Sequence, residues 1–368
     1  MRVVQVLGSS AGGVARHVGQ VADVLVERGT SVRVAGPASV APTVRAAAGA
    51  AGAALDVVDV EIADRPRGSD VGALRRLRAL ARDADVVHAH GLRAGALSVL
   101  GAVGLRARRP RVVVTLHNLP VGGRGVRTVS AVLERVVARG ADVVLGVSPD
   151  LVDLARVRGA RDVALALVPA PAVGERPGRS AAQVRDALGV RADQGLVVTV
   201  ARLAPQKGLD VLLDAASRCA MPLVWAVAGD GPLRADLAAQ VTARDLPVRL
   251  LGARDDVPDL LAAADVVVST ARWEGQPLWL QEALGAGAAV VATDVGGTAA
   301  VTGDAAVLVP TGPPGTCAEA LAAAVGTLLA DPDERAARAA ASLRRAAALP
   351  RRADLADQLD AVYRGSHA

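Results

Sequence analysis

Aromatic residues are scarce in this 368-residue chain: it has no phenylalanine, one tyrosine and three tryptophans. Isoleucine, asparagine and lysine also occur once each, as Ile62, Asn118 and Lys207. Such a bias is typical of a GC-rich genome, in which alanine, valine and arginine replace residues with AT-rich codons. With so few rings on which bases could stack, nucleic acid is not an expected partner. The positions that keep the only lysine and the only asparagine become candidates for a specific chemical role.

Cysteine and long apolar runs are scarce too. Cys219 and Cys317 fit no CxxC or Cys/His spacing, which predicts reduced thiols. No uncharged apolar run approaches the roughly 18–20 residues needed to span a bilayer. The opening run Val3–Leu7 has the length of a strand and is followed by glycine and serine, unlike a signal peptide. We therefore expect a soluble cytoplasmic protein, at most peripheral at the inner face of the membrane.

The chain has ample material for a core and a basic surface. Hydrophobic residues make up 52% and charged residues 21%, which suits two globular domains. A net charge of +5 and a pI of about 10.3 favour anionic partners such as phosphates or an acidic membrane. The segment 71–82 is expected to form a helix with arginines along one side: Arg75, Arg76, Arg78 and Arg82. They form either a solvated face or a surface that contacts anionic lipids.

Short apolar runs alternate with helical patterns, which predicts parallel sheets built from βαβ units. Strands are expected in the first half at 2–7, 31–35, 85–89, 111–116 and 142–147, and in the second at 196–201, 223–228, 248–251, 265–269, 288–292 and 306–309. We expect helices after each strand of the second half except the last two. A Pro- and Gly-rich stretch, 169–180, interrupts the alternation. The sequence thus predicts an α/β fold of two Rossmann-like domains, 1–172 and 173–350, facing each other across a cleft.

Several polar residues of the first domain are expected where strands end, and that edge of a parallel sheet binds ligands. Gly12 and Gly13 begin a helix after the first strand, either as a plain tight turn or as a backbone contact to a phosphate. His117, followed by Asn118, would donate to a substrate hydroxyl or orient a reacting centre. His90 also ends a strand, but no third ligand stands near enough for a metal site.

The second domain carries the stronger pattern. Arg202 and Lys207 lie in a short loop between a strand and a helix, where two cations would converge on a diphosphate. Backbone groups of 252–254 at another strand end would read a base. Glu274 follows the strand 265–269, and Glu282 stands eight residues later on a short helix. We expect these two carboxylates to grip different parts of one ligand.

The chain resembles the retaining glycosyltransferases of family 4, which have the GT-B fold. The resemblance lies in four features that occur in this order: the glycine loop, His117, the Arg202–Lys207 pair and the E-x7-E motif Glu274–Glu282. The resemblance covers nearly the whole chain. It implies transfer of a sugar from a nucleotide-sugar donor, UDP- or GDP-linked, to an acceptor hydroxyl with retained anomeric configuration. It implies no cofactor and no bound metal, and a terminal helix, 351–368, that packs back on the first domain.

The resemblance also implies roles for individual residues. Arg202 and Lys207 would neutralise the leaving diphosphate, Glu274 would hold the sugar and Glu282 the ribose, while Gly13 would lie against the diphosphate and His117 near the sugar. The catalytic candidates are His117, Arg202, Lys207 and Glu274. The donor-binding candidates are Gly12, Gly13, Arg202, Lys207, Gly252, Ala253, Arg254, Glu274, Gly275, Gln276, Pro277, Leu278 and Glu282. The candidates on the acceptor side are His17, His90 and Asn118, and the acceptor is a small molecule or lipid-linked.

The pattern departs from the family at two places. The chain reads EGQPLWLQE where the family commonly has EGFGLPxLE, and Pro277 supplies no backbone N–H. Ala299 and Ala300 replace a familiar Pro-Glu pair. Two other functions stay open: a nucleotide-sugar 2-epimerase of the same architecture, and a non-catalytic protein that binds nucleotides or membranes. A nicotinamide dehydrogenase is disfavoured, because the GxGxxG fingerprint and the ribose acid are missing.

Overall fold

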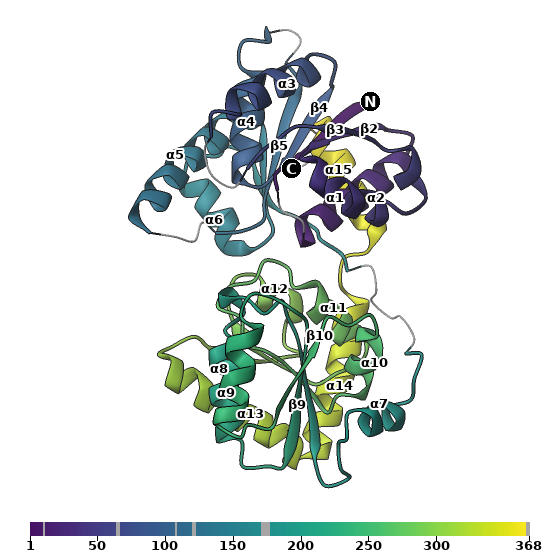
Figure 1. Ribbon diagram of the computed structural model, residues 1–368. Coiled ribbons are helices and arrows are strands. Elements are labelled where there is room, and N and C mark those ends of the chain that lie inside the picture. Colours follow the sequence, from purple (N-terminus) through teal and green to yellow (C-terminus); the bar gives the residue numbers. More distant parts are fainter. Residues whose placement is uncertain (10–11, 64–66, 107–108, 120–122, 171–176, 366–368) are drawn as a thin grey trace. The chain divides into compact units, whose positions relative to one another are not determined.

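The computed structural model describes residues 1–9, 12–63, 67–106, 109–119, 123–170 and 177–365. The chain forms two compact units (Figure 1). Unit 1 comprises Met1–Val168 together with Pro350–Ala368, and unit 2 comprises Pro169–Leu349. Within the described residues, no helix combines the length and the apolar character required to cross a membrane.

Unit 1 is built on a seven-stranded sheet whose strand pairs are all parallel. In spatial order its strands are β3 (Asp56–Asp59), β2 (Ser31–Gly36), β1 (Arg2–Leu7), β4 (Val86–His90), β5 (Arg111–Leu116), β6 (Val143–Gly146) and β7 (Val163–Leu165). Its helices are α1 (Gly13–Glu27), α2 (Ala41–Ala47), α3 (Asp70–Arg82), α4 (Leu92–Ala102), α5 (Arg124–Gly140), α6 (Pro149–Val157) and α15 (Arg352–Arg364). The central strands are almost wholly buried. Their runs of consecutive valines are typical of strands in a sheet that is covered on both faces.

Unit 2 has a six-stranded sheet, again with parallel strand pairs. The order is β10 (Val248–Gly252), β9 (Leu223–Ala228), β8 (Gly195–Val200), β11 (Val266–Ser269), β12 (Val290–Asp294) and β13 (Val307–Pro310). Helices α8 (Leu209–Arg218), α9 (Arg234–Ala243) and α13 (Pro314–Ala330) cover one face (Figure 1). Helices α7 (Ala181–Ala187), α10 (Val257–Ala263), α11 (Leu278–Gly285) and α14 (Pro332–Ala347) cover the other, and α12 (Thr298–Thr302) follows β12.

The expected fold of two parallel, Rossmann-like α/β sheets is confirmed. The structure adds β3 and β7, which the sequence did not predict because both are short, partly exposed edge strands. The expectation that loops rather than helices follow the last two strands was wrong. Helix α12 begins four residues after β12, and α13 follows β13 after a short loop. Asp331 starts α14 as expected, since its side chain accepts from the N–H groups of Asp333 and Glu334.

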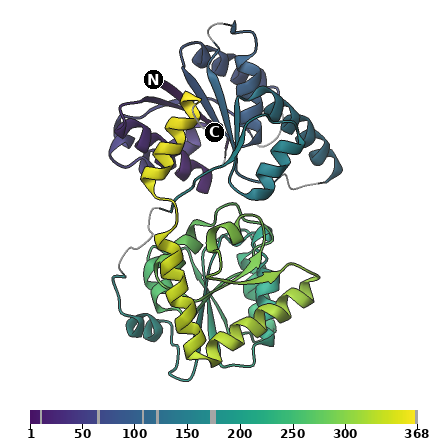
Figure 2. The ribbon, with the colours of Figure 1, turned by 180° about the vertical axis from the view of Figure 1, so that it is seen from behind.

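The last helix, α15, belongs to unit 1 although unit 2 precedes it in the chain. Arg28 of the first unit pairs with Asp357 at 2.6 Å and with Asp360 at 2.8 Å. Arg352 pairs with Asp23 at 2.7 Å, on α1. Figures 1 and 2 show this helix in yellow against the purple α1 from opposite sides. Ion pairs at both ends therefore fix α15 on the unit that contains the chain's first strand.

In each sheet the strand order reverses once, between β1 and β4 in unit 1 and between β8 and β11 in unit 2. The crevice at the carboxyl ends of such strands is where open α/β sheets bind ligands. The loops that leave β1, β8 and β11 carry the glycine, cation and carboxylate motifs found in the sequence. The fold thus places each group of candidate residues at a topological switch point of its own unit.

Candidate functional site

Lys207 and Glu274 meet at the switch point of unit 2. Lys207 ends the short 3₁₀ helix Pro205–Lys207 after β8, and Glu274 lies in the loop after β11. The lysine Nζ donates to the glutamate Oε1 at 2.5 Å. The two side chains are only 16% and 10% exposed, so the pair is largely withdrawn from water. The sequence had placed these two charges on separate halves of one pocket, and the structure joins them directly.

The loop that carries Lys207 packs tightly on the loop that leads to Glu274. The hydroxyl of Thr270 donates to the Lys207 carbonyl at 2.9 Å. Gly208 adopts a φ of +60°, and a Cβ built there would stand 2.0 Å from the Thr270 carbonyl oxygen. Only glycine accommodates both this backbone conformation and this approach. Gly208 therefore sets the register between the two loops.

Substitution of Gly208 with alanine is expected to destabilise unit 2 by about 2–4 kcal/mol, through the left-handed backbone and the clash with Thr270. Chemical denaturation measures this change. Gly326→Ala in α13 is the matched control, because no atom lies within 4 Å of the added Cβ and its φ is not positive. That control should be neutral or slightly stabilising. Equal stability of the two variants would contradict the assigned role of Gly208.

Glu274 is held from its other side by the turn after β12. A Cβ on Gly296, whose φ is +53°, would lie 2.0 Å from the Glu274 carbonyl oxygen. The N–H of Gly297 donates to the same oxygen at 3.0 Å. Thr293 adds a bond from its hydroxyl to the Ala271 carbonyl at 2.6 Å. Gly296 and Gly297 thus fix the backbone of the loop that carries Glu274.

Arg202 stands apart from this ion pair. It lies two residues after the end of β8, and its side chain is exposed. Among the described residues, none makes a hydrogen bond or ion pair with its guanidinium. Five donors in a planar fork are therefore available at the ligand edge, which suits a bidentate phosphate contact.

Glu282 and the unusual interior of the motif lie on or before α11. Glu282 is half-buried on this eight-residue helix, and the buried Pro277 is the N-cap residue of the helix. Gly275, Gln276 and Leu278 are half-buried in the same stretch. Because Leu278 starts the helix, its N–H precedes the first intrahelical bond. Pro277 has no N–H, but the next residue presents one at the helix start.

The segment 252–254, which was expected to read a base, can do so through its backbone but not through the Arg254 side chain. Gly252 ends β10 with a φ of +76°, and its carbonyl accepts the Gly229 N–H at 2.7 Å. Ala253 is exposed. The Arg254 side chain forms an ion pair with Asp256. Its Nε lies 2.7 Å from one carboxylate oxygen and its Nη2 lies 2.5 Å from the other. The guanidinium of Arg254 is therefore occupied within the protein.

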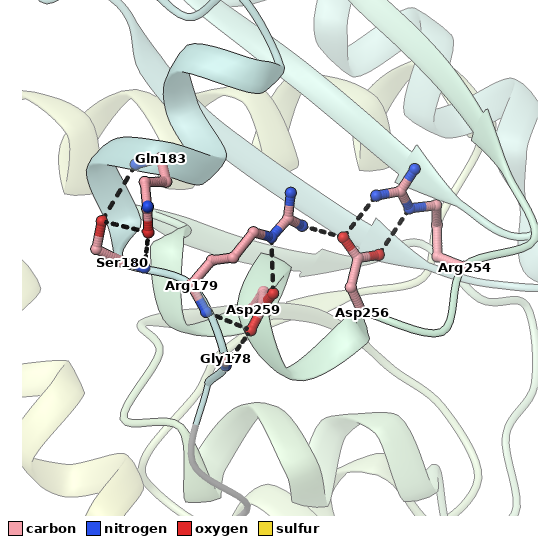
Figure 3. A network of polar contacts seen from close by, with 7 residues as sticks. All are labelled: Gly178, Arg179, Ser180, Gln183, Arg254, Asp256 and Asp259. Atoms are coloured by element: carbon pink, nitrogen blue, oxygen red, sulfur yellow. Dashed lines mark hydrogen bonds and ion pairs between the residues drawn. The ribbon is translucent and has the colours of Figure 1, made fainter.

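Asp256 binds both Arg254 and Arg179, and Arg179 lies in the segment before α7, as Figure 3 shows. Arg179 donates to Asp256 and also, through its Nε, to Asp259 at 2.9 Å. Asp259 is 8% exposed and accepts the Gly178 N–H at 2.6 Å. Hydrogen bonding from Arg254, helped by the charge of Arg179, lowers the pKa of Asp256 below its usual value. Hydrogen bonding from Arg179 lowers the pKa of Asp259. This network ties Gly178 and Arg179 to the start of α10.

In unit 1, Gly12 and Gly13 form the N-terminus of α1. Both are exposed, and neither has a positive φ. A Cβ built at either position meets no atom within 4 Å. The neighbouring serine and alanine, 10 and 11, lie outside the described residues. The fold itself does not require glycine here, which leaves close approach of a ligand as a reason for the pair.

Four histidines gather at the carboxyl edge of the unit 1 sheet. His117 is half-buried after β5, and its Nε2 lies 3.1 Å from His90 Nδ1. The rings of His17 and His117 are 5.5 Å apart, edge to face. His88 is fully buried beneath them, with its ring centroid 4.3 Å from that of His90. Asn118 is exposed next to His117.

Burial governs the ionisation of this cluster. It lowers the pKa of His17 to about 4 and, together with the charge of His17, that of His88 to about 3. The pKa values of His90 and His117 also fall well below 6.5, chiefly through burial. All four rings are therefore neutral at pH 7. Both ring nitrogens of His90 form hydrogen bonds, and the residue is 2% exposed. His90 therefore acts on a ligand only through its hydrogen bond to His117.

The arginines of the expected lipid-contacting helix, α3, have mixed roles. Arg78 donates to the carbonyls of Gly101 and Val103 and so caps the end of α4. Arg76 donates to the Asp59 carbonyl at 2.8 Å. Arg75 and Arg82 are exposed. Within the described part of the chain, His, Cys, Asp and Glu side chains nowhere gather in a group of three or more that could hold a metal ion.

Two family models match the chain, one on each half. Residues 12–171 match a model described as "Glycosyl transferase 4-like domain", and residues 194–331 match "Glycosyl transferases group 1". The chain belongs to the GT-B glycosyltransferases. Its N-terminal match agrees with the resemblance to family 4 that the motifs indicated.

The chain is also similar in sequence to curated proteins and in fold to solved structures. The chain is 31% identical to alpha-D-kanosaminyltransferase of Streptomyces kanamyceticus over 50% of its own length and 48% of that enzyme. It is 29% identical to a GDP-mannose-dependent phosphatidylinositol monomannoside mannosyltransferase of Mycolicibacterium smegmatis, over 66% and 67%. The chain spans less than half the length of most of the curated relatives that it matches. Anabaena HepE in complex with UDP and glucose has the same fold, with a TM-score of 0.79, 21% identity, and 99% and 100% of the two chains covered.

Proposed function

We propose that the protein transfers a sugar from a nucleoside diphosphate sugar to an acceptor hydroxyl. The observation that carries the proposal is the Lys207–Glu274 pair at the switch point of unit 2. Arg202 lies in the same loop as Lys207, and its guanidinium has no partner among the described residues. A diphosphate needs cations, and a sugar needs a fixed carboxylate that accepts from its hydroxyls. This edge supplies both, in a chain that belongs to the glycosyltransferases.

In this proposal unit 2 binds the donor. Arg202 and Lys207 neutralise the charge that develops on the diphosphate as the glycosidic bond breaks. Glu274, oriented by Lys207, accepts hydrogen bonds from the sugar, and Glu282 holds the ribose. The base lies against the backbone of 252–254, because the Arg254 side chain is engaged with Asp256.

Unit 1 supplies the acceptor side and part of the donor contact. The open glycine pair Gly12–Gly13 lies against the diphosphate, where backbone N–H groups of a helix start favour an anion. His117 contacts the sugar, with His17 and Asn118 beside it. The names of two relatives include a UDP-galactose and a GDP-mannose donor and lipid-linked acceptors, which supports a donor sugar linked to UDP or GDP.

The proposed reaction keeps the anomeric configuration and needs no bound metal. The bond from the sugar C1 to the diphosphate oxygen breaks, and a bond from C1 to the acceptor oxygen forms on the same face. The acceptor proton passes to the departing phosphate oxygen. The two cations of unit 2 supply the charge stabilisation that metal-dependent transferases obtain from an ion.

Thermal shift against UDP-, GDP- and ADP-sugars tests the donor. A donor at 100 times its Kd stabilises the fold by about 2.7 kcal/mol, which raises the melting temperature by several degrees. We expect this shift with a UDP- or GDP-sugar, and a smaller one in Arg202→Ala. If none of the three classes shifts the melting temperature, the proposal is wrong. Incubation of the stabilising donor without acceptor then identifies an epimerase, which would convert the sugar where a transferase leaves it intact.

A further inference from the structure

The histidine cluster is continued by hydrogen bonds that reach the last helix. His90 Nε2 lies 2.8 Å from the Gln5 Oε1, and the Gln5 Nε2 donates to the Tyr363 hydroxyl at 3.0 Å. That hydroxyl lies 2.7 Å from His88 Nδ1, and His88 Nε2 lies 2.7 Å from the Thr115 hydroxyl. Together with the His90–His117 contact, five hydrogen bonds form one unbranched chain from His117 to Thr115.

Neutral rings give this chain a direction. The Gln5 carbonyl oxygen only accepts, so His90 donates from Nε2. A neutral His90 then has an unprotonated Nδ1, which accepts from His117 Nε2. At the other end, Gln5 Nε2 donates to Tyr363, whose single proton is left for His88 Nδ1. Each bond fixes the next, and His117 is left with Nε2 protonated and with an unprotonated Nδ1 that bonds to none of the described residues.

We propose that Tyr363 is a positioning residue that fixes the tautomer of His117 through Gln5 and His90. Among the described residues, its hydroxyl is the group that accepts from Gln5 Nε2, and this bond leaves the Gln5 carbonyl oxygen facing His90. Tyr363 and Gln5 are 4% and 0% exposed, so water does not take over this role. The inference rests on the proposed function in one respect, the contact of His117 with the sugar.

The tautomer of His117 decides which kind of hydrogen bond it forms with a ligand. With Nδ1 unprotonated, His117 accepts a hydrogen bond from a ligand hydroxyl instead of donating one. Helix α15 brings Tyr363 to this position, and its ion pairs with Arg28 and Asp23 hold it there. Docking of the terminal helix is thus coupled to the hydrogen-bonding character of a side chain at the ligand edge.

The Tyr363→Phe variant tests this. A buried N–H left without an acceptor is rarer than a carbonyl left without a donor, so the Gln5 amide should turn its Nε2 toward His90. His90 and His117 would then both reverse, and His117 would carry its proton on Nδ1. ¹⁵N NMR of the imidazoles distinguishes the two tautomers directly. We expect His117 to be Nε2-protonated in the wild type and Nδ1-protonated in the variant, with kcat lowered on the order of tenfold, as for one lost hydrogen bond, and the KM for the donor nearly unchanged.

Two further variants keep the inference falsifiable. Gln5→Leu removes the acceptor that faces His90 without touching Tyr363. A buried N–H without an acceptor is disfavoured, so His90 should carry its proton on Nδ1 and His117 should do the same. Asp360→Asn removes an ion pair of α15 but leaves the Tyr363 hydroxyl, so it should lower stability without changing the tautomer. A wild-type His117 protonated on Nδ1, or a tautomer unchanged in both Tyr363→Phe and Gln5→Leu, overturns the inference. The NMR result stands without activity, so failure of the proposed function shows separately as loss of donor binding or transfer.

Discussion

Replacing Lys207 with alanine is expected to lower turnover by two orders of magnitude or more, the scale reported for removal of one preorganised group that stabilises developing charge. It should also destabilise unit 2. Lys207 is the partner of Glu274 at 2.5 Å, and without it a carboxylate that is 10% exposed is left unpaired. Breaking such a pair costs about 3 kcal/mol when it is well buried. Steady-state kinetics and urea denaturation measure the two effects independently.

Two controls separate chemistry from folding. Arg202→Ala removes an exposed cation that has no partner within the described residues, so it should reduce activity with little change in stability. The double variant Lys207→Met with Glu274→Leu replaces the ion pair by apolar groups, which is often neutral for stability. It should recover the free energy of unfolding but not the activity. Near-normal transfer by folded Lys207→Ala would refute the assignment of the diphosphate site.

Unit 1 is expected to lose stability as the pH falls below 6.5, ahead of unit 2. The pKa of a buried histidine is lower in the folded protein than in the unfolded chain, so only the unfolded chain takes up a proton between the two values. The histidines thus contribute full stability above pH 6.5. The loss grows as the pH falls toward about 4 for His17 and about 3 for His88. Each such histidine costs about 1.4 kcal/mol per pH unit in this window.

The distribution of aromatic residues makes this measurement direct. Trp225, Trp273 and Trp279 all lie in unit 2, while the single tyrosine, Tyr363, lies in unit 1. Denaturation followed by tryptophan fluorescence at pH 7.5, 6.5, 5.5 and 4.5 reports unit 2, and the tyrosine signal reports unit 1. We expect the tyrosine transition to move to lower denaturant and the tryptophan transition to move less. Coincident shifts of both would contradict the prediction.

His17 provides the control for the acid effect. Its Nδ1 is buried without a hydrogen-bond partner among the described residues. Replacing His17 with leucine removes both an unsatisfied polar atom and one suppressed titration, so the stability at pH 7.5 should not fall. The pH dependence of unit 1 should become shallower by the contribution of one histidine. An unchanged slope would show that other groups cause the acid loss.

The architecture was readable from the sequence because the buried strands of parallel sheets are continuous apolar runs. β4 and β5 are of this kind. The edge strand β3, with the sequence DVVD, was missed because it is neither long nor apolar enough to stand out. Helix α12 was missed because its few residues lie between glycines, 297 and 303. Its packing on the sheet, rather than intrinsic propensity, stabilises it.

The candidate site was predictable where chemistry and topology coincide. The loops after β8 and β11 are neighbours because their strands pair, so the proximity of Lys207 and Glu274 follows from the strand order. The engagement of Arg254 by Asp256, two residues away, is a matter of local side-chain geometry that no pattern of residue types displays. Tyr363 was beyond prediction for another reason. Its partner Gln5 lies 358 residues earlier, on a strand that reads as plain core.

The position of α15 bears on how the protein is made. During synthesis, β1 and β4 emerge early, but Tyr363 emerges only after all of unit 2. Until then the Gln5 amide and His88 have no tyrosine hydroxyl, and domains that fold first at the ribosome must tolerate that gap. Unit 1 therefore completes its histidine edge only after all of unit 2 has been made. The ligand edge of the first-made half thus matures later than the half that follows it.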